Sequence, residues 1–367
     1  MAVLIFGFSL WSILKPQQAF SDSERRALAK LPKFSLESVL QENADANFMS
    51  LFEKYSLDQF PLRDTFRRLK SIAAYYIFNR KDNNGIYLED GYAAKLEYPI
   101  SEDSIDYAVK KFSTINERFL KATKADIYAC IIPDKGYFLA EANGYLSMDY
   151  DLFYSLFREK MDFADFIDIR DTLEISDYYR TDTHWRQEAL VETAKTLAAG
   201  MGTVLTENYE ERILEHPFYG VYYGQSMLPL PSEEIHYLTA AFMENCTVYD
   251  HQNGKEISFY DMEKAIGKDP YEMFLSGNLS VVTIENPNAS TEKEMIVFRD
   301  SFGSSLLPLL AEGYRKITVV DIRYIQSSNL QVLRDKRTGE PLINFRDADD
   351  VLFLYSTLVL NNSGTLR

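Results

Sequence analysis

Short apolar runs alternate with amphipathic segments from residue 125 onward, and this alternation constrains the fold more than any other feature of the chain. The runs expected to form strands are 126–133, 166–169, 295–298, 317–320 and 351–355. The segments expected to form helices are 150–161, 186–201 and 303–311. Such alternation is typical of a mainly parallel sheet covered by helices, so we predict an α/β domain over residues 125–367.

One long stretch, at about 203–288, interrupts the alternation. It contains Gly-Tyr-rich turns and several β-like pieces, among them 244–249 and 279–284. We interpret it as an irregular insertion in the α/β domain that flanks the functional groove.

The N-terminus has a different character. Its first 14 residues are apolar and carry no charge before Lys15, like the core of a signal or an anchor, although a spanning helix needs about 20 apolar residues. No basic flank precedes them and no small-residue cleavage site follows. We therefore predict that residues 1–20 form an uncleaved membrane anchor, with a buried N-terminal helix as the alternative. Residues 21–124 are predicted to be a helical and linker region that packs on the core.

Composition excludes several kinds of partner. The chain carries 39 Lys and Arg against 55 Asp and Glu, and it shows no concentrated basic face, so we expect no nucleic acid. Its four histidines lack ligand spacing, so we expect neither a metal nor a cofactor. A disulfide between Cys130 and Cys246 stays open, because both cysteines lie in apolar runs that also suit buried thiols.

The first candidate reactive segment is the polar and aromatic loop 177–185. It lies between a predicted strand and a predicted helix, where open parallel sheets place their sites. Asp182 and His184 are two residues apart, so the carboxylate can fix the tautomer of the imidazole and stabilise its charged form. A purely structural role is the alternative for this pair.

The second candidate segment is the junction between the strand at 295–298 and the helix at 303–311. Ser301 lies in this junction, where its hydroxyl is exposed and the N–H groups of the helix start can face a developing oxyanion. Helix capping is the alternative role for this serine.

Together the two segments, YYRTDTHWRQEA and FRDSFGSSLLPLL, resemble those of the bacterial DHHW proteins and the related alginate O-acetyltransferase domains. Further similar landmarks are FSDSERRALAKLPKFS, DQFPLRDTFRRLK, IIPDKGYF and VVDIRY, so the resemblance covers nearly the whole chain. It implies a three-layer, SGNH-hydrolase-like domain in which the Asp-x-His motif precedes the serine. The chain departs from the family by having one histidine in its name motif and by Glu188, where glycine is expected.

The resemblance also implies roles for the reactive residues. Ser301 would be the nucleophile, His184 the general base and Asp182 its orienting group, because a serine hydroxyl needs a positioned base at neutral pH. The N–H of Ser301 would be the first oxyanion donor. Arg323 and Tyr324 are further candidates, and an ion pair with Asp321 is the alternative for Arg323. Two other residues have expected supporting roles: Asp300, which we expect to hold the turn, and Trp185, which either walls the acyl pocket or packs the next helix.

The expected activity is serine-dependent O-acyl transfer, with acetyl as the acyl group, onto a cell-surface or secreted polysaccharide. The resemblance places the protein outside the cytoplasm, anchored in the membrane, with a membrane-bound acyl-transfer protein as partner. Two alternatives stay open. A carbohydrate esterase or deacetylase would use the same triad, and a glycan-binding or scaffold protein of the envelope would keep the fold without turnover.

Overall fold

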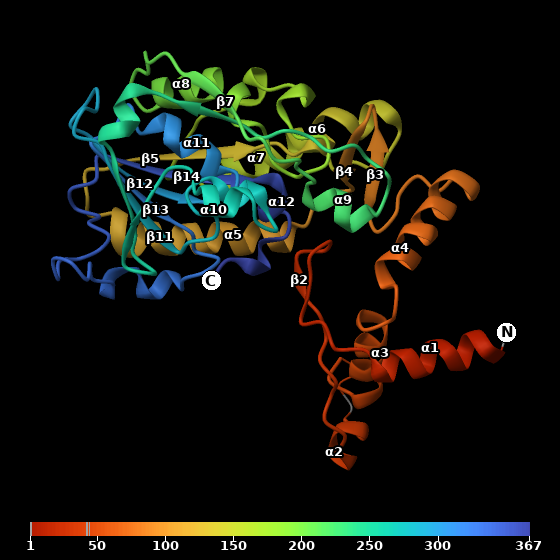
Figure 1. Ribbon diagram of the computed structural model, residues 1–367. Helices are drawn as coiled ribbons and strands as arrows, with labels where there is room; N and C mark the ends of the chain where they lie inside the picture. Colours follow the sequence, from red (N-terminus) through yellow and green to blue (C-terminus); the bar gives the residue numbers. More distant parts are fainter. Residues whose placement is uncertain (1, 42, 44) are drawn as a thin grey trace.

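A central eight-stranded sheet confirms the predicted α/β fold (Figure 1). The computed structural model describes residues 2–41, 43 and 45–367. In spatial order the strands are β10 (Lys255–Ile257), β9 (Thr247–Asp250), β11 (Val281–Glu285), β13 (Lys316–Val320), β12 (Glu294–Arg299), β14 (Asp350–Ser356), β5 (Asp126–Ile132) and β6 (Asp165–Phe166). Strands β13, β12, β14, β5 and β6 pair in parallel, whereas β11, β9 and β10 form an antiparallel edge.

The middle of the sheet is buried on both faces. All residues of β14 are buried, and in its register with β12 Phe298 lies opposite Phe353. Strands covered on two sides need continuous apolar runs, and this explains why β12, β13 and β14 were recognisable in the sequence.

Helices on each face of the sheet make three layers. One face is covered by α5 (Glu102–Ile115) and α7 (Tyr150–Lys160), and the other by α8 (Val191–Gly200) and α11 (Gly303–Leu310). Helix α5 starts at a Ser101 cap with two acidic residues in its first turn, and its buried residues recur at helical spacing.

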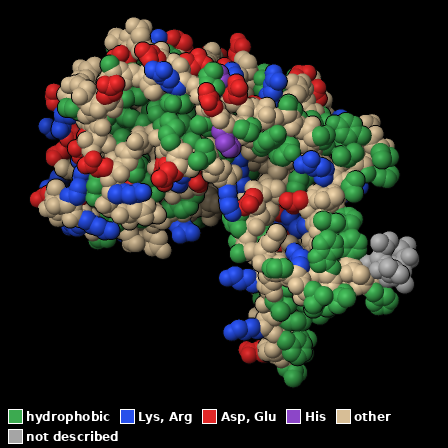
Figure 2. Space-filling view, in the orientation of Figure 1, with side chains coloured by type: hydrophobic (Ala, Val, Ile, Leu, Met, Phe, Trp, Pro, Cys, Tyr) green, Lys and Arg blue, Asp and Glu red, His purple; other side chains and the backbone are tan. Residues whose placement is uncertain are grey.

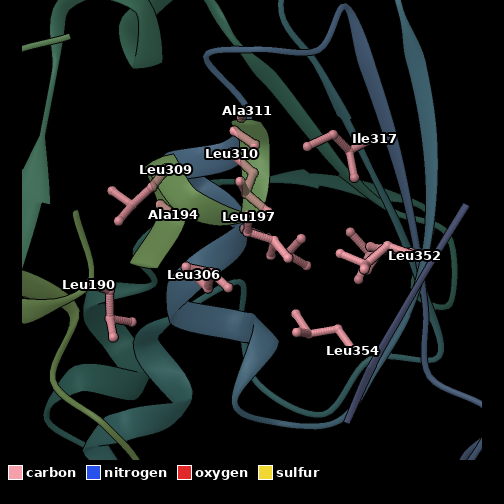
Figure 3. Packing of buried hydrophobic residues seen from close by; sticks show 14 of the residues in the cluster. Leu190, Ala194, Leu197, Leu306, Leu309, Leu310, Ala311, Ile317, Leu352 and Leu354 are labelled. Atoms are coloured by element: carbon pink, nitrogen blue, oxygen red, sulfur yellow. The ribbon is translucent and has the colours of Figure 1, made fainter. Parts of the chain in front are cut away.

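The core between α8, α11 and the sheet is made largely of leucines (Figure 3). Leu197 of α8 and Leu306 of α11 face Leu352 and Leu354 of β14, and all four are fully buried. Burying one such side chain contributes about 1.5–3 kcal/mol, so this layer fixes α11, and with it the start of the helix, against the end of β12.

The stretch at 203–288 is partly continuous with this sheet, because it supplies β9, β10 and β11. Its other elements are β7 (Glu210–Ile213), β8 (His236–Thr239), α9 (Val221–Ser226) and α10 (Met262–Ala265). Both cysteines are free thiols. Two further short helices of the core are α6 (Lys135–Leu139) and α12 (Thr357–Leu360).

The N-terminal helices stand away from the sheet (Figure 1). The elements in this part are α1 (Ala2–Leu14), β1 (Phe20–Ser21), β2 (Arg26–Ala27), α2 (Leu36–Val39), α3 (Phe48–Asp58), α4 (Arg63–Ile72) and the hairpin β3 (Ile86–Glu89) and β4 (Tyr92–Lys95). No helix in the described part of the chain has the length and apolarity needed to cross a membrane. Helix α1 has 13 residues, and the membrane anchor stays a prediction.

Candidate active site

The turn between β12 and α11 presents Ser301 at the end of the strand. Strand β12 ends at Arg299 and α11 begins at Gly303. The buried carboxylate of Asp300 accepts hydrogen bonds from the N–H of Phe302 (3.0 Å) and from the N–H and hydroxyl of Ser356 (2.8 and 2.6 Å). Asp300 therefore ties the turn to the end of β14, and Ser301 is left partly exposed.

The loop 177–185 folds back on itself and brings its two reactive side chains together. Tyr178 and Trp185 form an isolated antiparallel bridge, and the N–H of Tyr179 donates to the carbonyl of His184 (3.0 Å). Glu233 anchors the tip of the loop by accepting from the N–H and hydroxyl of Thr181 (2.7 and 2.6 Å).

A continuous chain of hydrogen bonds joins the two segments. His184 Nε2 lies 2.8 Å from Ser301 Oγ, and His184 Nδ1 lies 2.6 Å from Asp182 Oδ1. In the neutral tautomer with its proton on Nδ1, the imidazole donates to Asp182 and accepts from the serine hydroxyl. This is the geometry in which an imidazole can remove the serine proton.

Asp182 is fully buried and ionised. Burial alone raises its pKa, but the charge and hydrogen bond of His184 and the charge of Arg25 outweigh burial and hold the pKa below its ordinary value. The N–H of Val221 also donates to its Oδ2 (2.7 Å). A Cβ at Gly220 would lie 2.3 Å from the backbone of Asp182, so only glycine allows this close approach.

A tyrosine that the sequence did not suggest covers the imidazole. The ring of Tyr271 stacks on His184 with 3.8 Å between the centroids and 6° between the planes. Its hydroxyl lies 2.9 Å from Ser305 Oγ in α11, so a hydrogen bond holds the hydroxyl while the ring stacks on the imidazole. Tyr271 belongs to η8 (Pro270–Met273), where Asp269 followed by proline signals a helix start but indicates no contact with His184.

The candidate oxyanion donors differ in whether they already have a hydrogen-bond partner. The backbone N–H of Ser301 has no acceptor among the described residues. Arg323 pairs with the buried Asp321 through Nε (2.9 Å) and Nη2 (2.7 Å), so its alternative role, the ion pair, is the one observed. Tyr324 is 45% exposed and lies beneath the guanidinium of Arg323.

Trp185 does not line a pocket. It is fully buried, and its indole N–H donates to the carbonyl of Phe302 and to Ser305 Oγ, both at 3.0 Å. Of its two predicted roles the structure supports packing, since a side chain without exposed surface cannot touch a substrate. The indole instead links the histidine loop to α11.

An arginine from the N-terminal region also reaches the site. Arg25 Nη1 lies 2.7 Å from Asp269 Oδ2 and 3.5 Å from Asp182 Oδ2, and its Nη2 donates to the carbonyl of Tyr219 (2.8 Å). No local pattern predicts this contact, because 157 residues separate Arg25 from Asp182.

Comparison with known proteins places this geometry on a known fold. No family model matches the chain, and no curated protein matches it. Among solved structures, a DHHW family protein from Eubacterium siraeum matches with a TM-score of 0.59 and 20% identity, over 77% of this chain and 95% of that one. Bacillus cereus PatB1 with a sulfonyl adduct matches with a TM-score of 0.58 and 18% identity, over 75% and 95%.

The O-acetyltransferase domain of Pseudomonas putida AlgJ also matches, with a TM-score of 0.46 and 12% identity, over 76% of this chain and 92% of that domain. The first two matches show that the chain shares its fold with a DHHW family protein and with PatB1. The resemblance indicated by the sequence is therefore confirmed at the level of the fold.

Proposed function

We propose that this protein is an O-acyltransferase that carries an acyl group on Ser301 and passes it to a hydroxyl of a polysaccharide. The observation that carries the proposal is the hydrogen-bond chain from Ser301 through His184 to the buried Asp182. The identity of the acyl group, acetyl, and of the acceptor follows from the sequence resemblance to the DHHW and alginate O-acetyltransferase proteins.

The reaction proceeds in two balanced steps. His184 Nε2 takes the proton of Ser301 while Oγ bonds to the acyl carbon, and the leaving alcohol receives that proton as its bond to the acyl carbon breaks. The acceptor hydroxyl then gives its proton to Nε2 and attacks the acyl-enzyme. Serine leaves with that proton and the site is restored.

The surroundings of the histidine suit both steps. Asp182, kept ionised, stabilises the imidazolium that forms in each of them. The N–H of Ser301, which has no acceptor among the described residues, is the proposed donor to the developing oxyanion. The stacked Tyr271 holds the ring in the plane in which Nε2 meets the serine hydroxyl.

Hydrolysis is the second candidate, because Ser301 is partly exposed and water can reach an acyl-enzyme there. An esterase or deacetylase would use the same three residues and would differ only in the acceptor. A glycan-binding or scaffold protein without turnover is the remaining alternative.

The proposal includes a place in the cell. The apolar α1 and the exposed apolar residues of the N-terminal helices support attachment to the outer surface of a membrane. Attachment there would bring the site next to a membrane-bound protein that supplies the acyl group.

The test is a time course of acetyl release from p-nitrophenyl acetate by the full chain, with and without oligosaccharide acceptors. Ser301→Ala is expected to reduce release by at least about a thousandfold, whereas Ser328→Ala, which changes an exposed serine outside the triad, leaves it unchanged. Acetylated sugar in the presence of acceptor supports transfer, and release that ignores the acceptor supports an esterase. Release that is equal in Ser301→Ala and the unchanged protein contradicts both.

A further inference from the structure

The side chain of Arg25 extends from the N-terminal region to the triad, and it takes no part in the two proposed chemical steps. We propose that Arg25 is a positioning residue for the histidine, and that it makes activation of Ser301 depend on the docking of residues 20–27 against the α/β core. The inference rests on the proposed function, because it concerns how the same serine is activated.

The segment is shaped to present this arginine. Strands β1 and β2 form a short hairpin that lies between the core and the helices α1–α3 (Figure 1). Arg25 lies in the turn of this hairpin with φ 52°, in the left-handed region. A non-glycine residue pays about 1 kcal/mol for that conformation, so the contacts of the segment must hold it there.

The contacts that hold the segment come from both sides. On the core side, a Cβ at Gly224 would lie 1.6 Å from the backbone oxygen of Ser23, so the two backbones touch directly. On the helical side, Glu24 pairs with Arg63 (2.6 Å) and Arg67 (3.3 Å) of α4. Arg67 also donates to the carbonyl of Gly224 (3.0 Å), which ties α4, the segment and the core together.

Arg25 touches both groups that fix the imidazole. Its guanidinium lies against Asp182, which accepts from His184 Nδ1. It also pairs with Asp269, whose Oδ1 accepts from the N–H of Tyr271 (3.2 Å), and Tyr271 stacks on the imidazole ring. A single side chain therefore supports the hydrogen-bonding partner and the stacking partner of the base.

The arrangement needs an arginine and not merely a positive charge. Three acceptors, Asp182, Asp269 and the carbonyl of Tyr219, lie around the planar guanidinium. A lysine ammonium concentrates its charge on one nitrogen and lacks the planar fork, so it cannot bind all three acceptors in this geometry. Without Arg25, the carboxylates of Asp182 and Asp269 would face each other with no cation between them.

The charges around the histidine predict the direction of the effect. The charged and titratable groups that face Asp182 and the imidazole are Arg25, Lys135, Tyr222, Glu233, Asp269 and Tyr271. Partial burial raises the pKa of Asp269 to about 6, against the opposing charge of Arg25. Loss of the Arg25 cation leaves the negative charges of Asp182 and Asp269 uncompensated beside the imidazole, so we expect Ser301 to react only at higher pH.

The experiment measures the rate at which phenylmethylsulfonyl fluoride labels Ser301 in the full chain between pH 5 and 9. In this step Oγ bonds to sulfur, fluoride leaves and His184 accepts the proton, so no acyl donor or acceptor is needed. Arg25→Gln is expected to move the acid limb of the profile to higher pH and to slow labelling at pH 6 by about tenfold. Arg25→Lys is expected to recover part of the shift.

Two further variants separate positioning from docking. Arg26→Gln removes a neighbouring arginine of the same segment, which pairs with Asp58 (2.6 Å) and not with the site, and it should leave the acid limb in place. Asp269→Asn removes a negative charge near the imidazole, so it should move the limb to lower pH and offset part of the Arg25→Gln shift. Burial lowers the pKa of Lys135 to about 7, so this lysine also titrates within the measured pH range. The shift of the acid limb is therefore taken as the difference between each variant and the unchanged protein.

Two results would overturn the inference. A profile of Arg25→Gln that superimposes on that of the unchanged protein would show that Arg25 does not act on the base. An equal shift in Arg26→Gln would show that only docking of the segment matters. If Ser301 of the unchanged protein is not labelled at any pH, the proposed function itself fails, and this outcome is distinct because it appears before any variant is compared.

Discussion

The N-terminal region and the α/β core differ in charge and in the exposure of their apolar side chains. Residues 1–80 carry 11 Lys and Arg against 8 Asp and Glu, whereas residues 81–367 carry 28 against 47. Of the 31 large apolar side chains that are exposed in the described chain, 20 lie in residues 6–78. Figure 2 shows the same contrast, with hydrophobic side chains gathered over the N-terminal helices and acidic ones spread over the core.

This contrast indicates that the two regions have different roles. The core buries its apolar residues in two layers against the sheet and keeps an acidic, well-solvated surface. The N-terminal region leaves many of its apolar residues uncovered and is weakly basic, and this difference is the basis of the proposed attachment to a membrane. The segment around Arg25 connects the two regions, because it belongs to the N-terminal region and contacts the candidate active site of the core.

The largest expected effect tests whether the chemistry belongs to the core. Asp182→Asn keeps the shape of the side chain but removes the charge that stabilises the imidazolium and selects its tautomer. We expect the rate of acetyl release to fall by about 10³–10⁴-fold, in line with the effect of this change in serine hydrolases. The rate is measured by the same ester assay, and a loss of less than tenfold would mean that Asp182 is not the orienting group.

The second prediction compares the stability lost when a buried leucine of the core and an exposed leucine of the N-terminal region are shortened to alanine. Leu306 of α11 is fully buried, whereas Leu36 of α2 is 76% exposed. Leu306→Ala is expected to lower the free energy of unfolding of the core by about 2–5 kcal/mol, and Leu36→Ala to change it by no more than about 0.5 kcal/mol. Urea denaturation followed by fluorescence measures both, and similar losses in the two variants would remove the contrast.

The smallest expected effect concerns membrane attachment. Ile13 of α1 and Ile266 beside α10 are both well exposed, at 79% and 66%. Ile13→Asp is expected to weaken binding to vesicles of phosphatidylglycerol and phosphatidylcholine by about tenfold, since it removes apolar contact and adds a negative charge. Ile266→Asp is the matched control and should bind normally. Equal binding by both variants, measured by sedimentation with vesicles, would place the membrane contact elsewhere.

Much of the core fold could be predicted from the sequence. Strands β5, β12, β13 and β14 lie where their apolar runs predicted them, because strands covered on both faces leave an unambiguous signal. The helix predicted at 186–201 is instead a short turn at Gln187–Ala189 followed by α8. The turn directly follows the loop that carries His184, and an interruption of this kind leaves no signal in the apolar periodicity.

The candidate site was predictable only where its residues lie in recognisable segments. The two motifs indicated Asp182, His184 and Ser301, and the structure brings these three side chains within hydrogen-bonding distance. Arg25 and Tyr271 were missed because each reaches the histidine through packing between distant parts of the chain. An arginine in a charged linker and a tyrosine in an irregular stretch have many ordinary explanations, and only their neighbours in space distinguish them.

The short connection between α1 and Arg25 sets a working distance for the protein. Helix α1 ends at Leu14, and Arg25 follows eleven residues later. An extended chain covers at most about 3.6 Å per residue, so a bilayer holding α1 would keep Arg25, and the Asp182 carboxylate that it contacts, about 40 Å or less from the end of α1. Such a tether would restrict the acceptors to polymer strands passing close to the membrane, and the crowding of strands in that thin layer, instead of their bulk concentration, would govern turnover.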